Sequence, residues 1–478
     1  MNYMAPGFYI LLLITFIIYY LSPKSIRWVV LLISSCVFYF LACSKIPLLM
    51  LFLLTLLSTY CFSMLIEKQR RESAKTPEKK RRATLALGIF IPAVILLSSK
   101  GFEQIGILKD IRSSYLLPLG LSFYTLQIIA YLVDIYKGKT QAQKNFFKYA
   151  LFISFFPQII QGPIPRYSQL NEQLFAGHDY DDDRVMAGIN LVIWGFFLKY
   201  MIADKAGVIV DTIDASPQTY RGFYVVLCSV MYSFHLYADF LSCVTISRGV
   251  ARLFGIELTD NFRQPFFSTS VKELWGRWHV TLGTWLRDYI YIPLGGSRKG
   301  KVRRYINLFI TFFISALWHG MSLNFIVWGL LQAVFQIIED ASGKFSQSFY
   351  RFTYRVIRRL YVFAVFCFTF TFFRMPGFKE ALSAIGSVFT MPNPWIFFDG
   401  SIFRLGLNER EFGVLVFSLI LLLAVCIVKE KNISIRKWFF AQRTPVKWAI
   451  YLVLIWSIWI FGTYGYGFDS ASFIYGGF

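Results

Sequence analysis

The stretch YINLFITFFISALWHGMSLNFIVWGLLQAVFQII, residues 305–338, runs for 34 residues without an Asp, Glu, Lys or Arg. As one straight helix it would be roughly 50 Å long, whereas the hydrocarbon core of a bilayer is about 30 Å thick. Basic clusters flank it on both sides, SRKGKVRR at 297–304 and Lys344 with the arginines of 351–359. Because basic loops remain cytoplasmic, the chain must enter the membrane and return, either by two crossings or as a re-entrant hairpin.

His319, one of four histidines, lies near the middle of this stretch. Gly320 relaxes the backbone, so we expect the chain to break at Trp318, His319 and Gly320. This break would place His319 at depth, near the apex of two shorter helices. Ionisable side chains are costly inside a membrane, which makes the imidazole a candidate functional group. A histidine that packs or hydrogen-bonds only for structural reasons accounts for the residues equally well.

The overall composition indicates a polytopic membrane protein. Of 478 residues, 56% are hydrophobic and only 16% are charged, which is too apolar for an ordinary soluble domain. The net charge of +22 suggests nucleic acid at first sight, but the basic residues fall in short clusters between apolar runs. That distribution is typical of cytoplasmic loops, so we expect membrane lipid and no nucleic acid as a partner. The seven cysteines form no CxxC pair, so no metal site or disulfide framework is expected.

The loop at 67–82 predicts the orientation of the chain. It carries eight Lys or Arg against three Glu, which is typical of a cytoplasmic loop. Counting spans from it places both the N-terminus and the C-terminus outside the cell. We expect an all-α, single membrane domain with roughly 10–12 transmembrane helices plus re-entrant and interfacial helices. It divides into N-terminal helices at 1–114, a core at 115–340 and C-terminal helices at 341–478. The spans are predicted near residues 8–21, 28–43, 47–66, 84–98, 115–136, 188–203, 222–240, 360–373, 412–428 and 447–463.

Several segments between the spans depart from a simple apolar pattern. FFPQIIQGPIPRY at 155–167 mixes prolines and polar residues into an apolar background. Such a backbone is tolerated at membrane depth only inside protein or around a water-filled cavity. Residues 262–304 contain nine Lys or Arg, two acids and several Trp and Tyr, typical of amphipathic helices at the cytoplasmic interface. The acidic tract HDYDDDR at 178–184 is expected to be a solvated loop. His235 and Asp239 share one helical face, where they could form a base and its orienting partner.

A set of specific motifs occurs in order across residues 115–340. They include LGLSFYTLQIIAYLVDIYKGK, FPQIIQGPIPRYSQL, FHLYADF, RWH, WLRDYIYIPLGG and ALWHGMSLNFIVWG, and the chain closes on FIYGGF. In these motifs the chain resembles the membrane-bound O-acyltransferase (MBOAT) family, most closely the AlgI branch of alginate O-acetyltransferase membrane subunits and more distantly DltB. The resemblance implies the MBOAT fold, with helices around a central channel. It also implies that His319 is the catalytic histidine and that His279 is a second functionally sensitive position.

The activity that the resemblance implies is O-acyl transfer. Transfer to a hydroxyl needs a group that removes the hydroxyl proton, and a buried, neutral imidazole suits this role. The implied donor is acetyl-CoA or another acyl thioester or acyl carrier on the cytoplasmic side, with no cofactor bound. Arg298, Lys299 and Lys301 are candidates for binding its phosphates, although loop anchoring explains them too. The implied partners are a surface polysaccharide and an extracytoplasmic SGNH-type acetyltransferase, at the bacterial cytoplasmic membrane. Further candidates for lining the channel, or for internal hydrogen bonding instead, are Trp318, Asp239, Gln127, Gln161, Arg166, Trp285, Arg287 and Asp288.

Two other functions stay open. A DltB-like D-alanyl transferase acting on teichoic acid would share RDYIY but usually lacks the PLGGSRKGK that follows here. A transporter or flippase would use the same polar interior as a substrate path. We find no internal repeat, and acids such as Asp239 stand near predicted helix ends, which disfavours ion coupling. Departures from the AlgI pattern at 241–243 and 330–331 leave the acceptor open.

Overall fold

The computed structural model describes residues 3–43, 45–105, 119–342 and 352–464. Every regular element in these ranges is a helix. This confirms the all-α fold class. The predicted outer C-terminus, with FIYGGF, as well as Lys344 and Arg351, lies outside the described residues. The α-helices are α1 (Pro6–Leu21), α2 (Arg27–Ala42), α3 (Ile46–Arg71), α4 (Glu78–Ile105), α5 (Leu121–Tyr136), α6 (Phe146–Ser154), α7 (Tyr167–Ala176), α8 (Asp182–Phe197), α9 (Asp204–Ala215), α10 (Phe223–Leu253), α11 (Val271–Arg277), α12 (Val280–Leu286), α13 (Gly300–His319), α14 (Leu323–Ala341), α15 (Phe352–Arg374), α16 (Phe378–Thr390), α17 (Glu409–Glu430), α18 (Ile435–Phe440) and α19 (Thr444–Phe461). Two π-helices, η3 (Leu198–Ala203) and η5 (Arg287–Tyr291), adjoin α9 and α12.

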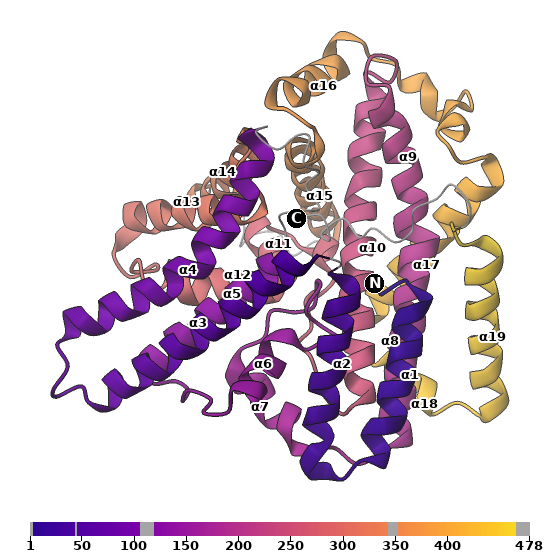
Figure 1. Ribbon diagram of the computed structural model, residues 1–478. Coiled ribbons are helices and arrows are strands. Elements are labelled where there is room, and N and C mark those ends of the chain that lie inside the picture. The colour runs from indigo at the N-terminus through magenta and orange to yellow at the C-terminus, as the bar shows by residue number, and fades with distance from the viewer. Residues whose placement is uncertain (1–2, 44, 106–118, 343–351, 465–478) are drawn as a thin grey trace.

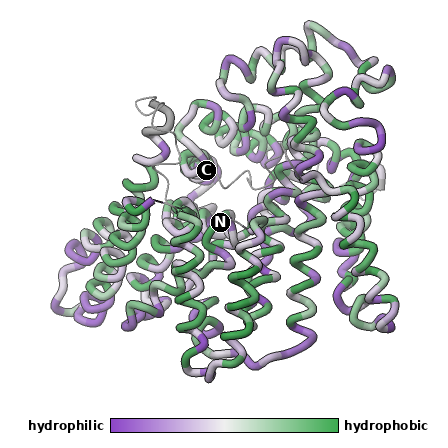
Figure 2. Tube along the Cα trace, turned by 45° about the vertical axis from the view of Figure 1, so that its right-hand side comes forward, coloured by the Kyte–Doolittle hydropathy of each residue, from purple (hydrophilic) through white to green (hydrophobic). Residues whose placement is uncertain are grey.

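The number and apolar character of the helices confirm a multi-pass membrane protein. Within the described ranges, nine helices are long and apolar enough to cross a membrane, and α1 and α5 are shorter apolar helices. In Figure 1 the α1–α2 turn and α18 lie at the lower end of the molecule, whereas the connection from α9 to α10 and α16 lie at the upper end. Figure 2 shows apolar helix flanks between hydrophilic loops at the two ends, as a bilayer requires.

One predicted span is much longer than expected. The apolar run at 188–203 is the centre of a continuous stretch, Asp182–Ala215, of 34 residues. The prediction ended too early because Asp204 and Lys205 look like the end of a span, yet both are buried in the protein. The acidic tract also ends earlier than expected. The Asp181 side chain accepts a hydrogen bond from the Arg184 amide at 2.6 Å, and acids in the first turn of α8 suit the positive end of the helix dipole.

The uncharged stretch folds as the predicted hairpin. α13 ends at His319 and α14 begins at Leu323, and the two helices pack along each other. Gly320 is extended, with φ 174° and ψ 165°, a conformation open to any residue. The glycine is needed for space instead, because a Cβ there would lie 2.5 Å from Cδ2 of Phe325.

The hairpin lies where two hydrophobic clusters meet. Trp318 belongs to a cluster built mainly from α1–α7, and Trp328 belongs to one built mainly from α9, α10, α15 and α17. At the apex, the Asn324 side chain donates to the Met375 carbonyl, just beyond the end of α15, at 2.6 Å. Because α15 carries Arg355, Arg358 and Arg359 in its first turns and ends at Arg374, the apex lies at the end of α15 opposite these arginines.

Candidate active site

His319 sits in a cage of aromatic rings at the C-terminal end of α13. Its imidazole is 5% exposed, and its ring centroid lies 4.7 Å from that of Trp318 and 5.1 Å from that of Trp328. Phe373, near the end of α15, adds an edge contact at 5.2 Å, and Phe325 stacks at 6.4 Å. The rings fix the imidazole plane and hold the surroundings at low polarity, where hydrogen bonding and charge interactions are stronger than in water.

Lys100, which the sequence did not single out, supports the same position. Its ammonium group donates a hydrogen bond to the His319 carbonyl at 3.0 Å and lies 5.8 Å from the Trp318 ring centroid. Lys100 is 3% exposed and comes from α4. A cation at the end of α13 satisfies one of the carbonyls that a helix leaves unbonded and opposes the negative end of its dipole. The only sequence signal was a lysine at the end of an apolar run, which usually marks a side chain reaching for the membrane surface.

His279 lies in the break between α11 and α12, where it adopts a left-handed conformation with φ 45°. Its Nδ1 lies 3.3 Å from Asn261 Oδ1, which also accepts the Thr281 amide at 3.0 Å. Because that amide can only donate, Asn261 Oδ1 is an acceptor and His279 Nδ1 donates to it. His279 Nε2 therefore carries the lone pair of the neutral ring, and it has no hydrogen-bond partner among the described residues.

The two histidines meet at a single indole. The Trp318 ring centroid lies 6.1 Å from that of His279 as well as close to His319. Phe240, on α10, closes the other side of His279 at 4.7 Å. The structure thus brings together the two positions, forty residues apart, that the resemblance indicated.

α5 holds the tryptophans of the site. The Trp318 indole donates to the Ser122 carbonyl at 3.0 Å and the Trp285 indole donates to the Leu126 carbonyl, one turn later, at 2.8 Å. Gln127, on the same helix, donates to the Phe152 carbonyl at 2.7 Å, which favours the internal hydrogen-bonding alternative for this side chain.

Two other predicted lining residues belong to the irregular segment 155–166. Gln161 is fully buried, and neither amide atom of its side chain bonds a described group, so it keeps its candidacy as a lining residue. Arg166 pairs with Asp288 at 3.5 Å, and Arg287 pairs with the same carboxylate at 2.9 Å. Arg166 also lies over the Tyr289 ring, 4.4 Å from its centroid. These contacts tie the segment to η5, which supports a role in holding the loop.

Asp239 belongs to a buried ion cluster rather than to the histidine cage. Lys199, in η3, pairs with Asp239 and Asp204 at 2.8 Å each. His235 Nδ1 lies 2.6 Å from the Ala203 carbonyl, and the pairing of His235 with Asp239 as base and orienting partner stays a prediction. Asp239 also lies in the middle of α10 and not near a helix end as expected, so that reason for disfavouring ion coupling was wrong.

A family model described as MBOAT, membrane-bound O-acyltransferase family, matches residues 142–377. The protein named "Probable alginate O-acetylase AlgI" from Pseudomonas fluorescens is 35% identical over 329 residues, 68% of this chain and 63% of that protein. The protein of that name from Pseudomonas syringae pv. tomato is 32% identical over 386 residues, 78% of this chain and 72% of that protein. This chain belongs to the MBOAT family.

Other MBOAT relatives carry different names. A "Peptidoglycan O-acetyltransferase" from Helicobacter pylori is 32% identical over 296 residues, 56% of each chain. A "Teichoic acid D-alanyltransferase" from Bacillus subtilis is 27% identical over 244 residues, 48% of this chain and 61% of that protein. The match to the Pseudomonas fluorescens protein covers slightly less than two thirds of its length.

The range of the MBOAT match contains most of the candidate site. Both histidines, the Trp318 indole and the ion cluster around Asp239 lie within residues 142–377, whereas Lys100 lies outside. The predicted donor residues Arg298, Lys299 and Lys301 also lie within it, exposed in the turn before α13 and its first residues. In the described part of the chain no carboxylate pairs with them, and their role in donor binding stays a prediction.

Proposed function

We propose that this MBOAT protein transfers an acetyl or similar small acyl group from a cytoplasmic thioester, acetyl-CoA, to hydroxyl groups of a cell-surface polysaccharide. The transfer is either direct or passes through an extracytoplasmic SGNH-type acetyltransferase. The observation that carries the proposal is the position of His319 at the apex of the α13–α14 hairpin, against the same indole as His279. The names of the AlgI relatives favour a polysaccharide acceptor.

In the proposed reaction His319 acts as the general base. Its imidazole takes the proton of the acceptor hydroxyl while the hydroxyl oxygen attacks the thioester carbonyl. The tetrahedral intermediate then collapses, breaks the carbon–sulfur bond and expels a thiolate, which receives the proton. The products are an ester and a free thiol. His279 positions a reacting group through its Nε2, and Lys100 holds the His319 main chain.

The proposed setting is the bacterial cytoplasmic membrane, with both termini outside. In this orientation the basic turn at 297–304 faces the cytoplasm, where the donor arrives, and the hairpin apex lies toward the outer end of α15. The core at 115–340 then carries the chemistry, and the helices at 1–114 and 341–478 frame it. Lys100, which belongs to the N-terminal helices at 1–114, also contributes to the site.

A second candidate is D-alanyl transfer to teichoic acid. The relative from Bacillus subtilis favours it, and the same base would serve, because D-alanyl esters also form by attack of a hydroxyl on a thioester. The two functions differ in the donor and in the polymer that becomes labelled.

The experiment is reconstitution of the purified protein in liposomes with radiolabelled acetyl-CoA or with a carrier protein charged with labelled D-alanine. Each donor is supplied with extracted surface polymers, with and without the SGNH protein. We expect label from acetyl-CoA to enter the polysaccharide fraction. Label entering only from the D-alanyl carrier would replace the proposal with the second candidate. No transfer from either donor, by protein shown to be folded, would contradict both.

A further inference from the structure

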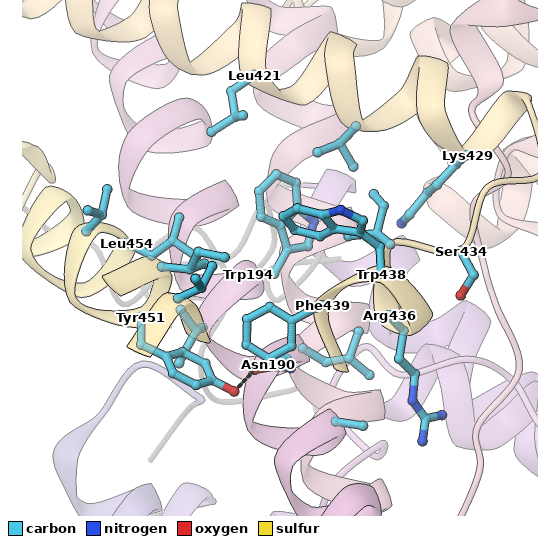
Figure 3. A pocket seen from close by; sticks show the side chains of 18 of the residues that line it. Asn190, Trp194, Leu421, Lys429, Ser434, Arg436, Trp438, Phe439, Tyr451 and Leu454 are labelled. Atoms are coloured by element: carbon cyan, nitrogen blue, oxygen red, sulfur yellow. Dashed lines mark hydrogen bonds between the residues drawn. The ribbon is translucent and has the colours of Figure 1, made fainter. Parts of the chain in front are cut away.

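A groove of about 820 Å³ runs between α8, α17, α18 and α19, on the opposite side of the molecule from the hairpin (Figures 1 and 3). Only 6% of the 18 residues of α19 are buried inside the protein, so this helix packs loosely against the bundle. A hydrogen bond from Tyr451 on α19 to Asn190 on α8 crosses this space. Most of the lining is apolar and aromatic, including Trp194, Leu421 and Phe439.

One end of the groove is basic. Lys429 in the last turn of α17 and Arg436 in α18 lie together with Ser434 on one side of the view, and Leu421 and Leu454 lie on the other (Figure 3). The carboxylate of Glu430, next to Lys429, is engaged with Arg277 at 2.7 Å. Among the described residues no ion pair joins a carboxylate to Lys429 or Arg436. Asp260, which pairs with Arg248, acts on Lys429 only from a longer distance.

The basic end also has the character of a membrane interface. It adjoins the loop between α17 and α18, at the same end of the molecule as the α1–α2 turn with Lys24 and Arg27 (Figure 1). Trp438, which lines the groove there, is 55% exposed, and tryptophan is enriched at the level of lipid headgroups. An apolar groove open at membrane depth must be filled, and hydrocarbon chains fill it at no desolvation cost.

We propose that this groove binds one glycerophospholipid of the inner leaflet with an anionic headgroup. The phosphate lies near Lys429 and Arg436, and the acyl chains lie between α8 and α19. The lipid then takes the place of a packing partner for α19. This site is separate from the acyl-transfer site, so it stands whether or not the proposed function is correct.

The test is native mass spectrometry of delipidated protein titrated with phosphatidylglycerol or with phosphatidylcholine. Wild type should bind the first phosphatidylglycerol about tenfold more tightly than phosphatidylcholine. In Lys429→Gln/Arg436→Gln that tenfold preference should disappear, because both cations that attract the anionic headgroup are gone. Lys437→Gln is the matched control, since it lies on the same short helix but outside the groove, and it should keep the preference. The charge-conserving pair Lys429→Arg/Arg436→Lys should also keep it.

A second pair of variants tests the groove itself. Ala449→Trp fills the groove and should weaken binding of both lipids, whereas Ala424→Trp, on an exposed part of α17 outside the lining, should not. Equal affinity of wild type for the two lipids would overturn the proposal. So would unchanged binding in Ala449→Trp, or a loss in Lys437→Gln as large as in the double variant.

Discussion

Single residues at the centre of the molecule show how far a sequence can point to a site. His319, His279 and Trp318 were all candidates from their residue types and the family motifs, and the structure places both imidazoles against one indole. Lys100 and Asn261 were not candidates. Lys100 meets His319 across 219 positions of the chain, and nothing in a local pattern reveals a contact that only tertiary packing creates.

A prediction at this scale concerns His279, which needs a residue that tolerates a left-handed backbone. Asparagine does so better than most residues, and it has no imidazole and therefore no Nε2. His279→Asn should therefore keep its thermal unfolding temperature while the rate of acyl transfer falls about 10²-fold, because the reacting groups lose their alignment. Asn261→Ala should lower the rate in the same direction. A rate within twofold of wild type in His279→Asn would show that the ring has no part in the reaction.

At the scale of elements, counting charges predicted the α13–α14 hairpin correctly, because lipid and basic loops impose simple rules on long segments. It failed where polar residues pair inside the protein. Asp204 and Lys205 looked like the end of a span, although both lie within the continuous stretch Asp182–Ala215, where Asp204 pairs with Lys199. The short amphipathic α16 also escaped prediction, since its 13 residues are too few for a membrane span of about 20 residues.

The turn of the hairpin gives a prediction about space. In Gly320→Ala the new methyl group meets the Phe325 ring, which is held against Phe373 with centroids 4.8 Å apart. Overpacking of this kind should lower the free energy of unfolding by about 1–3 kcal/mol and reduce acyl transfer at least tenfold. Thermal unfolding in detergent and the transfer assay measure the two effects.

Two further variants separate crowding from a general effect of the substitution. Gly320→Ala/Phe325→Leu should recover part of both losses, because the smaller side chain makes room. Gly386→Ala, where a Cβ meets nothing within 4 Å, should behave like wild type. If the double variant were worse than the sum of its single changes, the spatial explanation of Gly320 would be wrong.

The ion cluster of η3 and α10 gives a prediction about buried charge. Lys199→Met leaves Asp204 and Asp239 buried without their cation, which should lower the free energy of unfolding by about 3–5 kcal/mol. Lys199→Met/Asp239→Asn should lose less, because one of the stranded charges is removed. Lys24→Met breaks the exposed Lys24–Asp179 pair and should change the unfolding temperature very little. An equally mild effect of Lys199→Met would mean that the cluster contributes nothing to stability.

At the scale of the whole molecule, the spans alternate so that the loops after α3, α5 and α17 share one side and those after α9 and α15 share the other. The basic composition of the first set predicts that it faces the cytoplasm. The hairpin enters from that side and carries His319 toward the other, which is the arrangement that transfer across the membrane requires.

Single cysteines in a cysteine-free background test this topology. A bulky, membrane-impermeant maleimide added outside intact cells should label Gln218→Cys and should not label Ser73→Cys or Asn432→Cys. In inside-out vesicles the pattern should reverse. Met321→Cys, beside the apex, should resist the reagent from the cytoplasmic side. Ready labelling of Met321→Cys from that side would show that the apex is shallow.

The central claim, that His319 is the base of acyl transfer, is tested most directly by one substitution. Proteoliposomes containing wild type, His319→Ala or His178→Ala receive labelled acetyl-CoA and extracted surface polysaccharide, and the initial rate of label transfer is measured. Loss of a general base should reduce the rate by about 10²–10⁴-fold, whereas His178→Ala, a half-buried histidine at the start of the acidic tract, should stay within twofold of wild type. A folded His319→Ala protein that still transfers label at a rate near that of wild type would contradict the account.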